Sequence, residues 1–369
     1  MTRLRPDKIT LKDVADEAGC SKAVASAVLN GSRGNIGFSN ELRERVLDAA
    51  RRLGYVANFA SQSLALRRTR TLGVYIDPLL GGGIAGYYHL RILSGIEAAA
   101  VENRYDVLLV NFAGDTTVAG CIEKISQSRI DGLLLLHTGR NPTLVDAVLE
   151  ATSRVVAIDT LDPPDALQAV TYDHADAVRQ AVEHFVSLGH RRLGYAGPFS
   201  ARPVAHCRAR VDALRREAAA RGLDLPERSL FFSEDHASTP PAMSSAARLV
   251  RERFLALPPA ERPTALLANN DRLAADLMVG LADAGVSVPG DVSLVTFENT
   301  PITQVTRPAL TCLDHPLTEM AHRGTTRLIE AIESDPAPPS AGPAEPWHVV
   351  FPARLILGGT TAPPPPVSS

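Results

Sequence analysis

Cysteine is scarce in this chain of 369 residues, and its four cysteines lie far apart. They are Cys20, Cys121, Cys207 and Cys312, and no Cys-x-x-Cys pair occurs among them. Disulfide frameworks and cysteine-based zinc sites need several cysteines at short, regular spacings. The composition therefore favours reduced thiols, and we expect Cys20 to serve in packing.

Long apolar runs are missing as well. No apolar stretch approaches the roughly 20 residues that a helix needs to cross a bilayer. The segment Met1–Pro6 contains no apolar core of a signal peptide. We therefore expect a cytoplasmic protein without a membrane partner.

Sequence patterns for catalysis are also few. No Ser/His/Asp set, metal-ligand cluster or Walker loop is evident, so we expect neither an enzyme nor a bound metal or cofactor. The rival is a dinucleotide-binding enzyme, because Gly81–Gly86 satisfies G-x-G-x-x-G after a predicted strand. In that fingerprint the first glycine follows the strand directly, and an acidic residue ends a second strand about 20 residues on. Here Pro78-Leu79-Leu80 intervenes and no such acidic residue occurs, so we interpret the loop as an insertion at the edge of a cleft.

What the chain does contain begins with a pattern of three short helices. Thr10 and Asp13 form a capping box, in which each side chain accepts from the backbone amide of the other residue. Gly19 ends the first helix, because the left-handed conformation costs a residue without Cβ nothing. Ser21 is placed to cap a second helix and Ser39 a third. Apolar residues recur at helical spacing: Leu11, Val14, Ala15 and Ala18; Val24, Ala25, Val28 and Leu29; Leu42, Val46, Ala49, Ala50 and Leu53.

Two short helices joined by a tight turn form the unit whose second helix fits the major groove of DNA. Charge supports this interpretation over that of a helical protein-binding domain. Residues 1–70 carry 13 basic and 7 acidic side chains, a net charge of +6, whereas the other residues carry 25 and 34, a net charge of −9. A basic head on an acidic body is the charge asymmetry expected of a phosphate-binding module on a soluble carrier.

The motifs Leu11-Lys12-Asp13-Val14-Ala15-Asp16-Glu17-Ala18-Gly19-Cys20-Ser21, Val28-Leu29-Asn30-Gly31 and Gly54-Tyr55 with Asn58 resemble the lac-repressor family of bacterial transcription regulators. The resemblance implies that the second helix meets base edges or phosphates. It also implies that residues 58–66 fold into a hinge helix on DNA, with Leu64 wedged into a minor-groove step. The implied DNA-binding residues are Thr10, Ser21, Lys22, Ala23, Ser26, Asn30, Arg33, Asn58, Ser61 and Leu64.

The sequence departs from that family at Ala27, where Arg is frequent, and at Ala57, where Pro is usual. Few side chains of the second helix are able to read bases. We therefore expect phosphate contacts through Lys22 and Arg33, and specificity that depends heavily on groove shape and dimer spacing.

From Thr71 onward, short apolar runs alternate with helical stretches. Predicted strands are Leu72–Asp77, Asp106–Asn111, Gly132–Leu136, Val155–Asp159, Arg192–Ala196, Ala265–Ala268 and Val292–Phe297; predicted helices include Leu90–Glu102, Ala175–Leu188, Ala209–Arg221 and Arg272–Ala284. This alternation favours parallel sheets covered by helices on both faces. With 45% apolar residues, the chain is long enough for a small head and a body of two such units.

Gly189-His190-Arg191-Arg192, Ala268-Asn269-Asn270-Asp271 and Val288-Pro289-Gly290-Asp291-Val292-Ser293 again resemble the same family. Its body is similar to a periplasmic sugar-binding protein, with a ligand in the cleft between two α/β subdomains. The predicted divisions are a helix-turn-helix head at 1–57, a hinge helix and linker at 58–70, a ligand-binding and dimerisation core at 71–361, and a disordered Pro-rich tail at 362–369. Within the core we expect one subdomain at roughly 71–168 with 298–333, and the other at 169–297 with 334–361.

Ligands of open α/β sheets collect at the carboxyl ends of strands. Asp77, Asp173, Asn270, Asp271, Glu298 and Asn299 stand just after predicted strands. Matching the family motif adds further positions, so that the ligand-binding candidates are Tyr88, His89, Asp173, His206, Arg210, His236, Asp271 and Glu298. The alternatives are that Arg210 is a helix-surface charge and that Asp271 only caps the next helix. Asp176 is an alternative to Asp173 for the same ligand-binding role, and we prefer Asp173. The alignment of His206 and His236 with pocket positions of the family depends on loop lengths.

The resemblance implies a homodimer on a pseudo-palindromic double-stranded operator. The tail contains no leucine heptads, so the sequence gives no sign of a tetramerising coiled coil. The predicted function is a ligand-responsive regulator of transcription, a repressor, that senses a small-molecule effector. A sugar is the preferred effector, and a nucleobase or another metabolite is the alternative. Such a protein associates with the nucleoid when it is bound to DNA.

Overall fold

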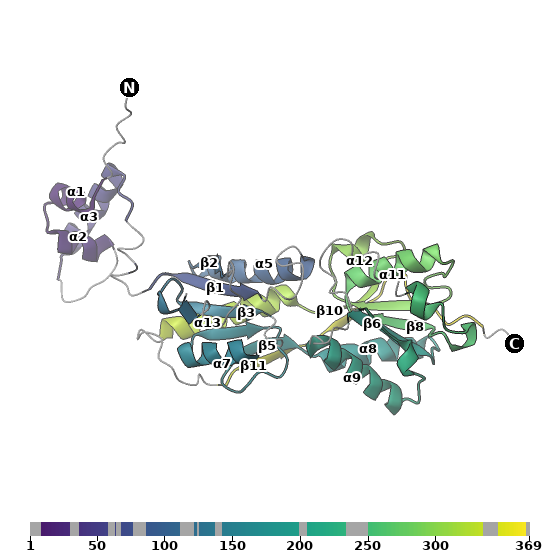
Figure 1. The fold of residues 1–369 in the computed structure, drawn as a ribbon. Coiled ribbons are helices and arrows are strands. Elements are labelled where there is room, and N and C mark those ends of the chain that lie inside the picture. The colour runs from purple at the N-terminus through teal and green to yellow at the C-terminus, as the bar shows by residue number, and fades with distance from the viewer. Residues whose placement is uncertain are drawn as a thin grey trace, which may run out of the picture.

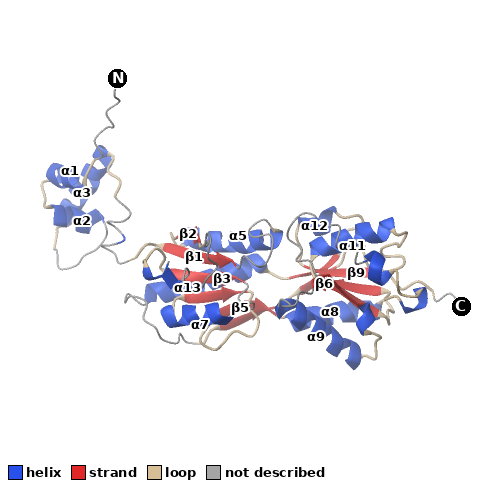
Figure 2. Ribbon diagram, viewed as in Figure 1, coloured by secondary structure: helices blue, strands red, loops and turns tan. Residues whose placement is uncertain are grey.

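A small helical head precedes two α/β subdomains that lie end to end (Figure 1). The computed structural model describes residues 9–29, 37–57, 63, 68–76, 86–110, 122–123, 125–136, 142–198, 205–233, 250–334 and 346–366. Figure 2 shows that strands form the centre of each subdomain and that helices cover both faces. The predicted fold class is thereby confirmed.

The head consists of α1 (Leu11–Ala18), α2 (Lys22–Leu29) and α3 (Asn40–Leu53). Its helix ends confirm the sequence interpretation. Thr10 Oγ1 accepts from the amide of Asp13 at 3.4 Å, and Asp13 Oδ2 accepts from the amide of Thr10 at 2.8 Å. Gly19 follows α1 with a φ of 65°, and Ser39 Oγ caps α3 by accepting from the amide of Leu42.

The core of the head is small and tightly filled. Val14, Ala25 and Val46, one from each helix, are completely buried. Cys20 is half-buried and packs against this core, as predicted. Small side chains at the helix contacts let three short helices share one core.

The first subdomain contains a six-stranded parallel sheet in the order β11-β5-β4-β3-β1-β2. Its strands are β1 (Thr71–Ile76), β2 (Asp106–Leu109), β3 (Gly132–Leu136), β4 (Val155–Ile158), β5 (Gln168–Tyr172) and β11 (His348–Phe351). The helices are α5 (Tyr87–Glu102), α7 (Pro142–Ala151) and α13 (Leu317–Ser334). The central strands β1, β3 and β4 are buried along their whole length, as expected for a sheet covered on both faces.

The second subdomain contains a six-stranded sheet in the order β12-β10-β9-β8-β6-β7, in which only β12 is antiparallel to its neighbour. Its strands are β6 (Leu193–Pro198), β7 (Leu230–Ser233), β8 (Ala265–Ala268), β9 (Ser293–Phe297), β10 (Thr311–Asp314) and β12 (Arg354–Ile356). Its helices are α8 (His174–Ser187), α9 (Ala205–Ala220), α11 (Asp271–Asp283) and α12 (Pro301–Val305), with short turns η4 (Glu227–Ser229), η5 (Val250–Phe254) and η6 (Pro259–Glu261).

The chain crosses between the subdomains three times: from β5 to α8, from β10 to α13 and from β11 to β12. The predicted subdomain boundaries differ from this arrangement. β10 belongs to the second sheet because it pairs with β9 and β12, whereas we expected 298–333 in the first subdomain. β5 and β11 pair with each other in the first sheet, whereas we expected both in the second subdomain.

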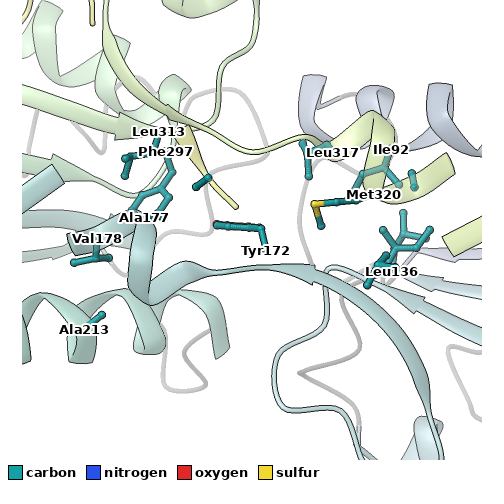
Figure 3. Packing of buried hydrophobic residues seen from close by; sticks show 14 of the residues in the cluster. Ile92, Leu136, Tyr172, Ala177, Val178, Ala213, Phe297, Leu313, Leu317 and Met320 are labelled. Carbon is teal, nitrogen blue, oxygen red and sulfur yellow. The ribbon is translucent and has the colours of Figure 1, made fainter. Parts of the chain in front are cut away.

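Apolar packing continues from one subdomain into the other through Tyr172. Figure 3 shows Tyr172 between the side chains of Phe297 and Leu313 on one side and those of Leu317 and Met320 on the other. All five are buried within one hydrophobic cluster. The end of β5 is therefore a shared part of both cores.

The beginning of the tail is ordered, contrary to the predicted disorder at 362–369. The carbonyl oxygen of Ala362 accepts hydrogen bonds from His190 Nε2 and Ser293 Oγ, both at 2.9 Å. The amide of Ala362 donates to Ser293 Oγ at 3.0 Å. These bonds attach the tail to the second sheet, and residues 367–369 lie outside the described part of the chain.

No helix in the described part of the chain combines the length and the apolar character that a membrane span requires.

Candidate functional site

The start of α2 presents the polar surface predicted to meet DNA. Ser21, Lys22 and Ala23 are exposed and Ser26 is half-buried, whereas Ala27 is buried against the head core. Ser21 Oγ accepts from the amide of Val24 at 3.3 Å and so caps the helix. Among the side chains at this helix start, Lys22 carries a charge suited to a phosphate. The predicted positions Asn30, Arg33, Asn58, Ser61 and Leu64 lie outside the described residues.

A second candidate site is a group of buried polar side chains where the two subdomains meet. Asp159 lies just past β4 and is only 1% exposed. Its backbone has a φ of 55°, a left-handed conformation that is uncommon for a residue with a Cβ. Strain of this kind concentrates at ligand-binding positions.

Four side chains surround the Asp159 carboxylate, among them Thr171, whose hydroxyl donates to Oδ1 at 3.5 Å. The Tyr88 hydroxyl, from α5, donates to Oδ2. His174 Nε2, at the start of α8, lies 3.6 Å from Oδ1, and His206 Nε2, in α9, lies at the same distance. His206 Nε2 also lies 3.0 Å from the Asp159 carbonyl oxygen, to which it donates. These contacts join the first subdomain to two helices of the second.

Burial alone would raise the pKa of Asp159, but His206 and His174 lower this pKa well below its usual range. Burial lowers the pKa of His174 to about 3, so its imidazole is neutral at physiological pH. The pKa of Tyr88 is raised well above its usual value by burial and by the charge on Asp159. The group therefore combines an ionised acceptor, a neutral imidazole and a protonated phenol.

Arg210, in α9, is the cation of the site. It is 5% exposed, so the alternative of a helix-surface charge is wrong. Its Nη1 donates to the carbonyl oxygen of Asn269 at 2.7 Å and to Oδ1 of the same residue at 2.9 Å. Its Nη2 donates to the Tyr172 hydroxyl at 2.5 Å, and its Cζ lies 3.8 Å from the centre of the Phe297 ring. Its Nε has no hydrogen-bond partner among the described residues, so this group is left to bind a ligand.

Two carboxyl groups lie at the carboxyl ends of β8 and β9. Asp271 is 2% exposed and accepts from Thr300 Oγ1. The helix cap is Asn270, whose Oδ1 accepts from the amide of Leu273 at 2.8 Å, so Asp271 is not merely a cap. Glu298 is half-buried and has a φ of 73°. Burial and the neighbouring Asp271 raise the pKa of Glu298 well above its usual value, which favours a proton shared between the two groups.

Aromatic faces complete the site. The Tyr172 ring lies between two histidines: its centre is 3.8 Å from that of His174 and 4.2 Å from that of His315, on which it stacks at an interplanar angle of 14°. His315 is fully buried, and burial lowers its pKa to about 3. Its Nε2 has no hydrogen-bond partner among the described residues. The site therefore combines stacked, buried aromatic rings with hydrogen-bonding groups.

The structure brings most of the predicted ligand-binding residues into this region: Tyr88, His206, Arg210, Asp271 and Glu298, with His89 buried beside Tyr88. It does not bring in Asp173, whose exposed carboxylate instead caps α8 by accepting from the amide of Asp176 at 2.8 Å. His236 lies outside the described residues.

The sequence interpretation missed Asp159, Tyr172, His174, Asn269 and His315. The sequence did contain a signal for Asp159. This residue ends a predicted strand, and ligands of open α/β sheets bind at the carboxyl ends of strands. Asn269 likewise follows the predicted strand Ala265–Ala268. The other three had no such signal, because Tyr172 ends β5, His174 lies just after β5 and His315 follows β10, and neither strand was predicted.

Comparison with known proteins identifies one family in the head and another in the body of the chain. Residues 10–58 match the lacI family of bacterial regulatory proteins, and residues 182–361 match a periplasmic binding protein-like domain. Catabolite control protein A of Priestia megaterium is 26% identical over 310 residues, which cover 84% of this chain and 88% of that protein. The matched head family is one of regulatory proteins, and a further relative, 28% identical over 327 residues, is the HTH-type transcriptional regulator GalS of Salmonella typhimurium. The comparisons therefore do not support the dinucleotide-binding alternative, whose Gly81–Ala85 segment lies outside the described residues.

Solved structures of the same fold cover nearly the whole chain. The lac repressor dimer bound to operator and the anti-inducer ONPF has a TM-score of 0.74 at 20% identity, and the match covers 96% of this chain and all of that one. The complex of the transcriptional regulator CelR with cellobiose has a TM-score of 0.65 at 23% identity, with the same coverage.

Proposed function

The chain belongs to the lacI family of bacterial regulatory proteins, and we propose that this transcriptional regulator represses its target genes from a pseudo-palindromic operator, as a homodimer. A sugar bound between the subdomains is its effector. The protein acts in the cytoplasm and associates with the nucleoid when it is bound to DNA.

The observation that carries the sensing role is the buried polar group between the subdomains. It contains a cation at Arg210, carboxyl groups at Asp159 and Asp271, and the hydroxyl group of Tyr88. Sugar hydroxyls need donors and acceptors in fixed directions, and these groups supply both. The CelR structure, which has the same fold, contains cellobiose. This supports our choice of a sugar over a nucleobase as the effector.

Binding of DNA is attributed to the basic head and the hinge. The net charge of +6 over residues 1–70 supplies the phosphate contacts, with Lys22 at the exposed start of α2. We place Leu64 in the minor groove, where an inserted apolar side chain unstacks a base step and bends the duplex.

Apolar side chains exposed along one side of the body support the homodimer. In the first subdomain they are Tyr87, Leu90 and Val101 on α5, with Val107 and Leu109 on the edge strand β2. In the second subdomain Val279 and Val305 are 49% and 70% exposed, beside a cavity of about 570 Å³ lined by α11 and the turn after α12. Figure 1 places α5 and β2 on the same long side as α11 and α12. A face of this composition fits a second copy of the chain.

The position of the effector between the subdomains couples effector binding to DNA binding. A ligand that binds the closed cleft better than the open one changes how the first subdomains of the dimer face one another, and so whether the hinges fold on DNA. Such a coupling free energy is typically about 1 to 3 kcal/mol.

The test has two parts. First, a thermal-shift screen against sugars and purines identifies the effector, and a response to purines alone would contradict the sugar assignment. Second, Leu64→Ala is expected to weaken binding to a selected operator far more than binding to random duplex. Equal losses on both duplexes would contradict the hinge assignment.

A further inference from the structure

Three side chains from distant parts of the sequence converge where the two subdomains meet, with the spacing of metal ligands. They are Asp159 from the first subdomain and His174 and His206 from the second. Their donor atoms lie within 4.8 Å of one another, and all three residues are buried. The expectation of no metal site came from short-range sequence spacing, which does not detect ligands that only the fold brings together.

We propose that Asp159, His174 and His206 bind a divalent transition-metal cation such as Zn²⁺, which links the two subdomains across the cleft. Two imidazole nitrogens and one carboxylate oxygen form a ligand set that first-row transition metals prefer. Mg²⁺ and Ca²⁺ prefer oxygen ligands, so the two nitrogens select against them. Three protein ligands leave a coordination position for water or for an effector oxygen.

The distances are close to those of a bound ion. Metal–ligand bonds of about 2.0 to 2.2 Å at tetrahedral angles place the ligand atoms about 3.3 to 3.6 Å apart. Asp159 Oδ1 lies 3.6 Å from His174 Nε2 and 3.6 Å from His206 Nε2. The metal bond to His206 replaces the hydrogen bond that its Nε2 makes to the Asp159 carbonyl oxygen at 3.0 Å.

His174 provides an independent observation. Its side chain is 3% exposed, yet neither ring nitrogen has a hydrogen-bond partner among the described residues. A buried polar atom without a partner costs about 1 to 3 kcal/mol, so native structures rarely leave one unexplained. A bond from Nε2 to a metal removes part of that cost.

Tyr88 supports the site from outside it. Its hydroxyl donates to Asp159 Oδ2, whereas Oδ1 faces both imidazoles and accepts from the Thr171 hydroxyl at 3.5 Å. Outer partners of this kind orient a ligating carboxylate, and their loss typically weakens metal binding about 10- to 100-fold. Tyr88 is therefore a positioning residue for the metal.

The experiment is a titration of chelator-treated, full-length protein with Zn²⁺ by calorimetry and with Co²⁺ by visible absorption. We expect one equivalent per chain and cobalt d–d bands without thiolate charge-transfer absorption. Mg²⁺ is expected to give no binding. A wild-type protein that binds no Co²⁺, or whose cobalt spectrum has thiolate character, would overturn the proposal without any variant.

Variants then locate the ion. His206→Ala and His174→Ala are expected to abolish binding of the one metal equivalent per chain. Tyr88→Phe is expected to lower the metal affinity about 10- to 100-fold. His322→Ala is the control, because this exposed histidine lies beside Glu102 on the surface, and it is expected to retain full binding. Undiminished binding in folded His206→Ala and His174→Ala would exclude the site. Because DNA and sugar are absent from these titrations, their outcome does not depend on the proposed function.

Discussion

Arg210 donates from Nη2 to the hydroxyl of Tyr172 at 2.5 Å, and this bond joins α9 of the second subdomain to the last residue of β5 in the first. The same guanidinium is held by Asn269 and lies over Phe297, both in the second subdomain. Opening of the cleft must therefore break the bond to Tyr172 while the contacts within the second subdomain persist. Arg210 is positioned to respond both to a ligand and to closure.

Replacement of Arg210 by Ala is expected to abolish the response to the effector and to leave operator affinity without effector within about threefold of wild type. The reason is that Arg210 contacts the cleft and not the head. Fluorescence anisotropy of a labelled operator, with and without effector, measures both quantities. The loss of bonds to Asn269 and Tyr172 costs about 1 to 3 kcal/mol of stability, so folding is verified by circular dichroism.

Arg208→Ala is the matched control for this prediction, since Arg208 is an exposed arginine of the same helix. It is expected to respond to effector as wild type does. An unchanged response in Arg210→Ala would remove Arg210 from the ligand site.

Features fixed by neighbouring residues could be predicted from the sequence. The capping box of Thr10 and Asp13 and the left-handed Gly19 depend on a few consecutive residues, and the structure contains both. The central strands β3 and β8 are continuous apolar runs, which a parallel sheet buries on both faces.

Features that depend on residues far apart in the chain could not be predicted from the sequence. β10 and β11 are short, and their sheets are determined by pairing with β9 and β5, which lie elsewhere in the chain. The error in the subdomain boundaries follows from this. His315 follows β10, so the missed strand concealed this residue of the site. Asp271 was identified both from its place after a predicted strand and through the family motif, and Arg210 through the family motif.

The helix contact at Gly95 gives a prediction about stability. A Cβ on Gly95, in α5, would overlap the carbonyl oxygen of Thr318 in α13 and lie 2.9 Å from the Cβ of Ala321. Gly95→Ala must therefore push the two helices apart, and we expect a loss of at least about 1 to 3 kcal/mol in unfolding free energy. Urea denaturation measures this loss. Ser94→Ala, at an exposed position of the same helix, is expected to change stability by less than about 0.5 kcal/mol.

The exposed apolar face predicts the effect of one charge on assembly. Val305→Asp places a carboxylate on the proposed dimer face, where a second copy would bury it unpaired. Light scattering after size exclusion is expected to show a shift from dimer to monomer at micromolar concentration. The same substitution at Val350, an exposed valine on β11, is expected to leave the dimer intact. Monomers in both variants or in neither would contradict the placement of the face.

Acid sensitivity is expected from the buried His315. Burial lowers its pKa in the folded protein from 6.5 to about 3, so between these values the unfolded chain binds more protons than the folded one. The free energy of unfolding therefore rises with pH in this window and falls as the solution is acidified. From pH 7.5 to pH 5.0 this one group is expected to remove about 2 kcal/mol.

His315→Phe retains a ring to stack on Tyr172 and removes the titrating group. The variant is expected to lose about 2 kcal/mol less than wild type over the same pH change, as measured by urea denaturation at each pH. Ser94→Ala, at an exposed position of α5 and without a titrating group, is the control and is expected to show the same acid loss as wild type. Because Asp159 faces His315 and its negative charge opposes the effect of burial, equal acid losses in wild type and His315→Phe would mean that His315 is protonated in the folded protein.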